Sequence, residues 1–252
     1  MKRIFLLFFL LLGVLSAWAY EVEVDGIYYN LDKKNKTASV TSGEAKYKGT
    51  VVIPESIGVN GTTYSVTSLG ERCFRGCSGL TSITIPNSVT SLGAYCFAAC
   101  SGLTSIDISN SVTSLGTECF GSCTGLTSIT IPSSVTSLGA YCFYDCSGLT
   151  EVHANCETPP TIETMAWSIF DQCDALETIY VPIGASANYN VGPWNAYKIV
   201  EEDVQSGITA VMAEGEATAP VYHLNGSRAG TTDNLSAMPK GIYIANGKKV
   251  LR

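Results

Sequence analysis

Ten cysteines are the residues of this 252-residue chain whose type and spacing suggest chemistry. Eight of them form Cys-x3-Cys pairs that recur every 23 residues, while Cys156 and Cys173 stand outside that spacing. In an oxidising compartment such pairs are typical of disulfides, of soft-metal ligands or of buried thiols that pack as small apolar groups. The pairs are Cys73/Cys77, Cys96/Cys100, Cys119/Cys123 and Cys142/Cys146.

Other catalytic groups are few. The only histidines are His153 and His223, and neither lies in a zinc-protease or serine-hydrolase motif. Cys156 follows His153 by three residues, which keeps a Cys-dependent hydrolase as an alternative function. No third group near them would orient the histidine, so we expect no catalytic residue. We also expect no metal site and no cofactor.

The composition excludes two broad classes of protein. With 46% hydrophobic and 15% charged residues, the chain is too apolar for a disordered protein and must bury a core. The net charge is −7 and no basic cluster is present, so the sequence lacks the phosphate-neutralising side chains that nucleic-acid binding requires.

The elements that position the cysteines recur with the same 23-residue interval. Residues 82–85 alternate polar and apolar side chains, which predicts a half-buried strand that Pro86 ends. Residues 89–92 predict a second short extended piece, and residues 95–100 a helical turn with both cysteines on one face. Gly102 suits the left-handed position that closes this turn.

One such coil has no interior of its own and must stack on the next, so the repeats predict a solenoid over residues 50–182. The unit Ile-Pro-x-Ser-Val-Thr-Ser-Leu-Gly-x-x-Cys-Phe-x-x-Cys-Ser-Gly-Leu-Thr-Ser-Ile resembles the BspA-like leucine-rich repeats of secreted and surface proteins of Bacteroidetes and other microbes. The resemblance implies an α/β repeat fold, a right-handed leucine-rich-repeat solenoid with one strand and one short helix per coil.

In this arrangement disulfides and metal sites fit the cysteines poorly. Helix neighbours four apart hold their Cβ atoms about 5–6 Å apart, and equivalent cysteines of adjacent coils are parallel, whereas a disulfide needs about 3.5–4.5 Å and converging bonds. A regular ladder does not close four ligands around zinc. We therefore expect two ladders of buried thiols, with Cys156 and Cys173 as the candidates for a reactive or paired thiol.

The N-terminal segment reads as a signal peptide. Lys2 and Arg3 precede an apolar run, and Ala17-Trp18-Ala19 is typical of a cleavage site, so residues 1–19 predict export and no transmembrane segment after cleavage. Residues 20–49 predict a β-hairpin cap over the first coil, with a polar turn at residues 32–36.

The C-terminal part divides into three segments. Residues 183–200 contain aromatic side chains suited to closing the array, residues 201–215 are expected to be a linker, and residues 216–252 a small β-module. Two Asn-Gly hairpin signals lie in that module. It resembles a short form of the C-terminal secretion or sorting domains of Bacteroidetes.

Binding residues are expected on the outer side of the strands. If the isoleucines face inward, the intervening polar residues form parallel columns on the other face of the sheet, which is the surface that solenoids use for binding. The columns become less uniform toward the C-terminal repeats, where charged and aromatic side chains favour recognition. The predicted ligand-binding residues are Asp107, Thr130, Glu151, His153, Trp167 and Tyr180.

The sequence therefore predicts a secreted or cell-surface, non-enzymatic, adhesin-like protein that recognises another protein. The resemblance implies a host extracellular or bacterial surface protein as the partner. A glycan-binding module that stacks sugars on Tyr180 or Trp167 is an alternative, and the chain is expected to be a monomer.

Overall fold

The computed structural model describes residues 21–162 and 169–203, and the backbone of four strands within residues 220–251. The predicted signal peptide and Trp167 lie outside the described residues. The chain separates into two units, one of residues up to Val200 without residues 182–184, and one formed by those three residues and residues 201–252. Each unit is described by itself below.

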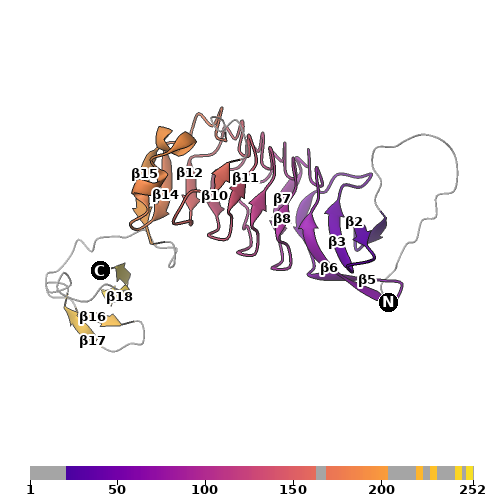
Figure 1. Cartoon of the computed structure of the whole chain (residues 1–252), viewed down its shortest axis with the longest axis horizontal. Helices are drawn as coiled ribbons and strands as arrows, with labels where there is room; N and C mark the ends of the chain where they lie inside the picture. The colour runs from indigo at the N-terminus through magenta and orange to yellow at the C-terminus, as the bar shows by residue number, and fades with distance from the viewer. Residues whose placement is uncertain are drawn as a thin grey trace. The chain divides into compact units, whose positions relative to one another are not determined.

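The first unit is a β-solenoid of about six turns, in which short strands of successive coils pair with one another along the array (Figure 1). The nine-stranded sheet has the order β1-β2-β3-β6-β8-β9-β11-β13, with β5 paired to β6. Its strands are β1 (Val22–Val24), β2 (Ile27–Asp32), β3 (Thr37–Thr41), β5 (Ser56–Val59), β6 (Thr62–Leu69), β8 (Ser91–Leu92), β9 (Ser114–Leu115), β11 (Ser137–Leu138) and β13 (Thr161–Ile162).

The strands that carry the predicted outer face form a two-stranded sheet, β4-β7, and a four-stranded sheet, β10-β12-β14-β15, and we call the two together the main sheet. It contains β4 (Gly49–Val52), β7 (Leu80–Thr84), β10 (Ser128–Ile131), β12 (Glu151–Ala154), β14 (Thr178–Pro182) and β15 (Lys198–Glu202). The third coil contributes a single bridge, Thr84 to Asp107, in place of a strand. The isoleucines of this sheet face the core, as the alternation predicts.

The predicted helix of each coil is wrong. Residues 95–100 form consecutive turns, because the N–H of Cys96, Ala98 and Cys100 each donate to a carbonyl three residues back. The N–H of Phe97 instead donates to Cys119 O of the next coil, and Tyr95 and Ala99 have positive φ. These bonds between coils use donors that a helix would need internally. The described residues contain no α-helix, only the 3-10 turns η1 (Ser186–Tyr189) and η2 (Gly192–Ala196).

The repeated glycines have a different role from the predicted one. Gly102 does not have positive φ, and a Cβ on it would lie 2.3 Å from Ser78 O of the preceding coil. A Cβ on Gly125 would lie 2.2 Å from Ser101 O. Gly102 and Gly125 exclude a side chain because adjacent coils touch there. Most of the repeat positions with positive φ, which we call left-handed corners, carry residues other than glycine, such as Tyr95 and Ala99.

The core contains a column of stacked phenylalanines, one from each coil. The rings of Phe74, Phe97, Phe120, Phe143 and Phe170 follow one another at centroid distances of 5.2, 5.3, 5.5 and 5.5 Å. Tyr47 packs on the first ring, and Trp194 meets the last ring edge-on. The ring column therefore continues through every coil and ends on a residue of η2.

The ten thiols are all buried, as predicted for the eight cysteines of the two ladders. Cys100, Cys123 and Cys146 each donate a hydrogen bond to the carbonyl of the phenylalanine 26 residues earlier. Cys173 makes the same bond to Phe143 O, so the interpretation of Cys173 as an outlier is wrong. In the other ladder the sulfurs of Cys73 and Cys96 are 3.4 Å apart.

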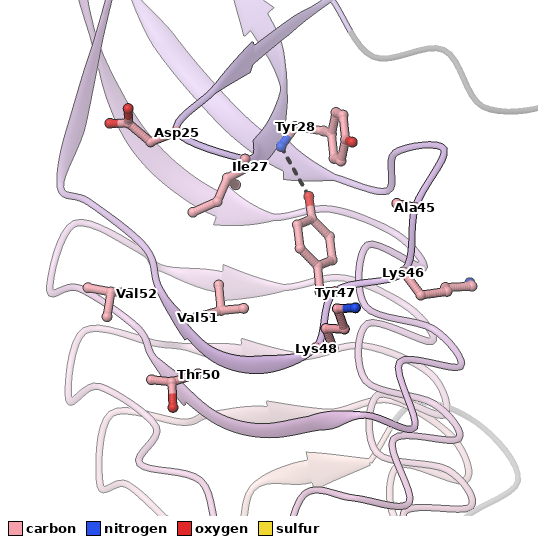
Figure 2. Close-up of a pocket in the computed structure, with 11 residues that line it drawn as sticks. Asp25, Ile27, Tyr28, Ala45, Lys46, Tyr47, Lys48, Thr50, Val51 and Val52 are labelled. Carbon is pink, nitrogen blue, oxygen red and sulfur yellow. Dashed lines mark hydrogen bonds between the residues drawn. The ribbon is translucent and has the colours of Figure 1, made fainter. Parts of the chain in front are cut away.

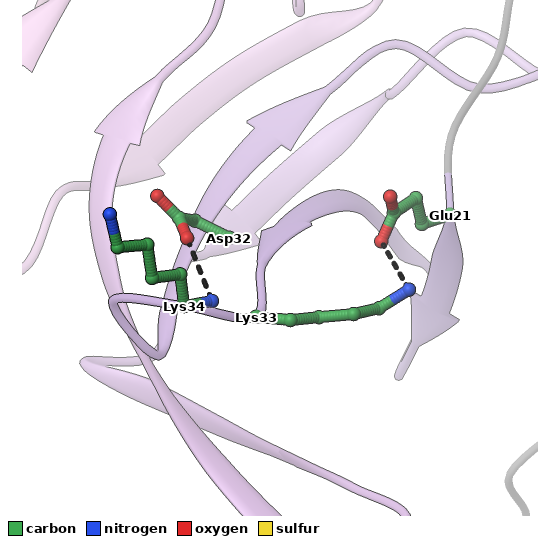
Figure 3. A network of polar contacts seen from close by, with 4 residues as sticks. All are labelled: Glu21, Asp32, Lys33 and Lys34. Atoms are coloured by element: carbon green, nitrogen blue, oxygen red, sulfur yellow. Dashed lines mark hydrogen bonds and ion pairs between the residues drawn. The ribbon is translucent and has the colours of Figure 1, made fainter.

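The N-terminal strands differ from the predicted single hairpin. The chain turns once at Asp25-Gly26 and again after Asp32, so β1, β2 and β3 form an antiparallel group, and β3 then pairs in parallel with β6. At the second turn, Asp32 Oδ1 accepts hydrogen bonds from the N–H of Lys34 and Asn35, while Lys33 Nζ lies 3.8 Å from Glu21 (Figure 3). The hydrogen bonds from Asn35 lower the pKa of Asp32.

The segment after β14 packs aromatic side chains on the last coil. Tyr189 and Trp194 are buried and meet edge-on at 5.2 Å, and the Tyr189 hydroxyl donates to Cys156 O. The acidic pair Glu201-Glu202, which the sequence assigns to a linker, lies in β15, and Glu202 is buried.

The second unit contains a four-stranded antiparallel sheet with the order β17-β16-β18-β19. Its strands are β16 (Pro220–His223), β17 (Arg228–Thr231), β18 (Ile242–Ala245) and β19 (Lys248–Leu251). The two predicted hairpins correspond to the pairs β16–β17 and β18–β19.

Candidate functional site

Outward side chains of the main sheet line up in two columns that cross the coils. The pairing register places Val52 opposite Thr84, Thr84 opposite Asp107, Thr130 opposite His153, and His153 opposite Tyr180. We call this series the outer column. The neighbouring column includes Ser128, Glu151 and Thr178.

Three of the predicted binding residues are in contact at the C-terminal end of the outer face. The His153 and Tyr180 rings stack at 4.7 Å with an angle of 8° between their planes. Glu151 lies two residues before His153 on β12, and its carboxylate is 3.7 Å from His153 Nε2. The side chains of Glu151 and His153 are 47% and 28% exposed, so this cluster faces solvent.

The stacking decides which part of the aromatic rings a ligand can reach. The centroid distance of 4.7 Å equals the ordinary spacing of about 4.7–4.9 Å between strands, so the rings lie face to face along the sheet. Stacking therefore covers one face of each ring. A sugar stacks on a ring face, whereas protein side chains and backbone groups also pack against ring edges and polar tips.

The other predicted binding residues lie elsewhere. Asp107 and Thr130 are exposed members of the outer column, two coils and one coil before His153, respectively. The structure thus places five of the six predicted residues on one face. Val52 begins the outer column and is 61% exposed, but it is not among the predicted binding residues. Its outward position follows from the alternation Val51-Val52-Ile53, in which both neighbours are buried.

Charge is distributed unevenly along the chain. Residues 76–197 contain nine carboxylates and no lysine or arginine. Residues 21–75 contain seven of each sign. The coils that carry Glu151 and His153 therefore present a surface of negative potential, which attracts cationic partners.

The geometry does not support a hydrolase based on Cys156. Its thiol is buried and directed toward the carbonyls of Pro132 and Val135, while His153 stacks on Tyr180 on the outward face. Burial raises the pKa of Cys156 to about 11, which opposes formation of a nucleophilic thiolate. Among residues 21–162 and 169–203, no group of three or more His, Cys, Asp or Glu side chains is arranged to hold a metal ion.

Two cavities of the first unit lie away from the Glu151, His153 and Tyr180 cluster. One of about 360 Å³ is bordered by residues 170–174 and by residues of η2 and its C-terminal flank. The other, of about 330 Å³, lies between residues 25–28 and residues 45–52 (Figure 2).

The repeats match a known family. Residues 67–191 match the BspA type leucine rich repeat region in six copies. The repeat array of this chain belongs to that family, as the sequence resemblance implies. Leucine-rich repeats generally bind proteins, and a binding role follows for the scaffold at that level.

Solved leucine-rich-repeat proteins share the fold. A leucine-rich repeat protein from Bacteroides ovatus is 26% identical with a TM-score of 0.53, and the match covers 73% of this chain and 50% of that chain. The chain thus spans about half the length of that relative. The leucine-rich repeat protein of T. pallidum is 23% identical with a TM-score of 0.54, and the match covers 63% of this chain and 70% of that chain.

A leucine rich cell surface protein from Faecalibacterium prausnitzii is 22% identical with a TM-score of 0.50, and the match covers 83% of this chain and 60% of that chain. No curated protein matches the chain by sequence. Of the helices in the described part of the chain, none combines the length and the apolarity that crossing a bilayer requires.

Proposed function

We propose that this protein is a secreted or cell-surface, non-enzymatic, adhesin-like binding protein that recognises another protein through the outer face of its main sheet. The cluster of Glu151, His153 and Tyr180 carries the proposal, because a carboxylate, an imidazole and a phenol are held together on a half-exposed surface. Aromatic side chains beside charged ones are typical of interface hot spots.

Two features favour a protein over a glycan as the ligand. The stacking of His153 on Tyr180 covers one face of each ring, which leaves less ring face for a sugar. The lack of any cation in residues 76–197 favours a partner with lysines and arginines on its surface, since opposite potentials steer association. A basic host extracellular or bacterial surface protein has this chemistry.

Export is part of the same proposal. The N-terminal Lys2-Arg3 pair, the apolar run and the Ala17-Trp18-Ala19 pattern support it. The C-terminal sheet is then a candidate sorting module, which cleavage of the tail during secretion would test.

The experiment compares binding of the protein from Tyr20 onward to an array of purified extracellular proteins and to a glycan array. The variant Glu151→Ala/His153→Ala/Tyr180→Ala is matched by Ser82→Ala/Thr84→Ala, which alters the same face near its other end. We expect saturable binding to at least one basic protein, weakened tenfold or more by the triple variant only. Raising the salt concentration should weaken this binding further.

Equal binding by both variants would remove this site from the proposal. Binding to glycans alone would replace protein recognition by glycan recognition.

A further inference from the structure

No described strand pairs with the N-terminal edge of the main sheet, although the N-terminal strands pair along the edge of the nine-stranded sheet. There β3 pairs with β6 and continues the nine-stranded sheet outward. In contrast, β4 pairs only with β7, and no other strand of the described residues pairs with its second edge. Unpaired strand edges are templates for another strand, so proteins normally cover or charge them.

The hydrogen bonds of β4 show which backbone groups face this edge. The N–H of Ile53 donates to Thr84 O, and the register between β4 and β7 is regular from Thr50 to Val52. In a parallel strand alternate residues point their N–H and C=O to opposite sides. The N–H and C=O groups of Thr50 and Val52 therefore point away from β7, toward this edge.

A groove runs along the same edge. The cavity of about 330 Å³ is lined by residues 25–28 on one side and by residues 45–48 and 50–52 on the other (Figure 2). The hydrogen bond from the N–H of Tyr28 to the hydroxyl of Tyr47 joins its two sides. The volume lies within the range of about 300–1,000 Å³ that ligand sites occupy.

The side chains along the groove indicate the chemistry of its occupant. Val52 is 61% exposed and offers an apolar contact to the next residue in the plane of the sheet. Lys46 and Lys48 line the groove, with Asp25 as the carboxylate among its lining residues. Lys46 also donates to Arg75 O, which fixes its ammonium group at the corner. This local excess of positive charge contrasts with the acidic coils that follow.

We propose that this groove is a second binding site, in which an extended, acidic segment of a partner protein adds as a strand to β4. The backbone of Thr50 and Val52 exchanges hydrogen bonds with the added strand, which is the general mode of β-augmentation. An apolar side chain of the segment packs on Val52, and a neighbouring carboxylate pairs with Lys48.

The test uses a fluorescent seven-residue peptide, Thr-Val-Glu-Val-Thr-Val-Glu, with blocked ends, and the protein from Tyr20 onward. Two control peptides carry N-methyl groups on alternate amides or lysine in place of glutamate. Fluorescence anisotropy measures binding, and amide hydrogen exchange reports on Thr50 and Val52. We expect both amides to exchange rapidly in the free protein and at least tenfold more slowly with saturating peptide, and both control peptides to bind at least tenfold more weakly.

A matched pair of variants isolates the backbone contribution. Val52→Pro removes an N–H that faces away from β7, and proline is tolerated at such edge positions. Val52→Thr keeps the N–H while changing the same side chain. We expect Val52→Pro to lower the affinity at least tenfold relative to Val52→Thr, with similar thermal melting of the two variants. If Val52→Pro fails to fold, exchange at Thr50 in the unchanged protein still decides the matter.

The proposal is overturned if the N-methylated peptide binds as well as its parent, or if saturating peptide leaves exchange at Thr50 and Val52 unchanged. It is also overturned if these amides become protected with rising protein concentration and no peptide, because the occupant is then a second copy of this chain.

Discussion

Replacement of Phe120 by alanine tests the stacked ring column directly. The side chain is fully buried, and its ring contacts Phe97 at 5.3 Å on one face and Phe143 at 5.5 Å on the other. Truncating a core phenylalanine costs about 3–5 kcal/mol, and each aromatic pair adds about 0.5–1.5 kcal/mol to area burial. With two ring pairs lost, the lower ends of these ranges add up to about 4 kcal/mol, so we expect Phe120→Ala to lower the free energy of unfolding by at least about 4 kcal/mol.

The matched variant Phe120→Leu separates stacking from burial. Leucine retains most of the buried volume, for which a core exchange costs under about 1.5 kcal/mol, but loses both ring pairs. We expect a loss of about 2 kcal/mol in urea titrations followed by circular dichroism. Ser105→Ala, at an exposed position, should change stability by less than about 0.5 kcal/mol.

The cooperativity of unfolding in the Phe120→Ala variant depends on the solenoid architecture. Each coil contacts only its neighbours, so a weakened central coil should lower the urea dependence of unfolding or split the transition in two. A loss below about 2 kcal/mol for Phe120→Ala, or equal losses for the alanine and leucine variants, would refute the view that the ring column couples the coils.

Three further predictions concern the corners and the thiols. Ala99 has a φ of 60°, so Ala99→Gly should raise stability by about 0.5–1 kcal/mol, and Gly76→Ala at the equivalent corner should lower it, as thermal melts would show. Gly125→Ala should lower the free energy of unfolding by about 1–3 kcal/mol, because its Cβ would meet the preceding coil. Gly121→Ala should cost less, because its Cβ would contact only the Glu118 side chain, and equal melting temperatures of the two variants would contradict this prediction. Burial raises the pKa of Cys156 to about 11 and that of Cys123 to about 12, from 9.0. Because the unfolded thiols ionise first, stability should be intact below pH 9 and fall as the pH rises from about 9 to 12, by up to ~1.4 kcal/mol per pH unit for each thiol; constant stability between pH 8 and 10.5 would contradict this prediction.

The spacing of residues in the sequence was enough to predict the coils and their interior. An exact 23-residue interval allows only a stacked repeat, and the alternation around Ile83 and Ile129 determines which side chains face the core. Burial of the thiols also follows, since Cys96 and Phe97 recur at the same place in each coil. Glu151, His153 and Tyr180 could be assigned to one face for the same reason.

The corner conformation could not be predicted because two structures give the same pattern. A helical turn and two successive β-turns both return side chains to the same side after four residues, so the Cys-x3-Cys pairs do not separate them. The deciding factor is where the N–H of Phe97 finds its acceptor, and that acceptor is Cys119 O in the next coil. Such long-range bonds leave no signal in the sequence of one repeat.

Cys173 and the free edge of β4 escaped prediction for related reasons. A longer interval separates Cys173 from Cys146, but insertion length does not show whether the next coil resumes the ladder. The edge of β4 is free because none of the described strands before it pairs with β4. That depends on β3 pairing with β6 and not with β4, which is a choice between distant partners.

The stacked ring column gives successive repeats equivalent contacts, so one repeat can replace another. The steps from Phe97 to Phe120 and from Phe120 to Phe143 differ by only 0.2 Å, and the corner glycines Gly93, Gly116 and Gly139 keep the same contact with the coil before them. Residues 94–116 form one repeat, which begins after Gly93 and ends with Gly116. Unequal recombination that removes or duplicates this repeat keeps the same kinds of contact between neighbouring coils in the core. Duplication or deletion of whole repeats can thus change the length of the solenoid without changing the contacts of its core. The distance between the two candidate binding sites changes with it.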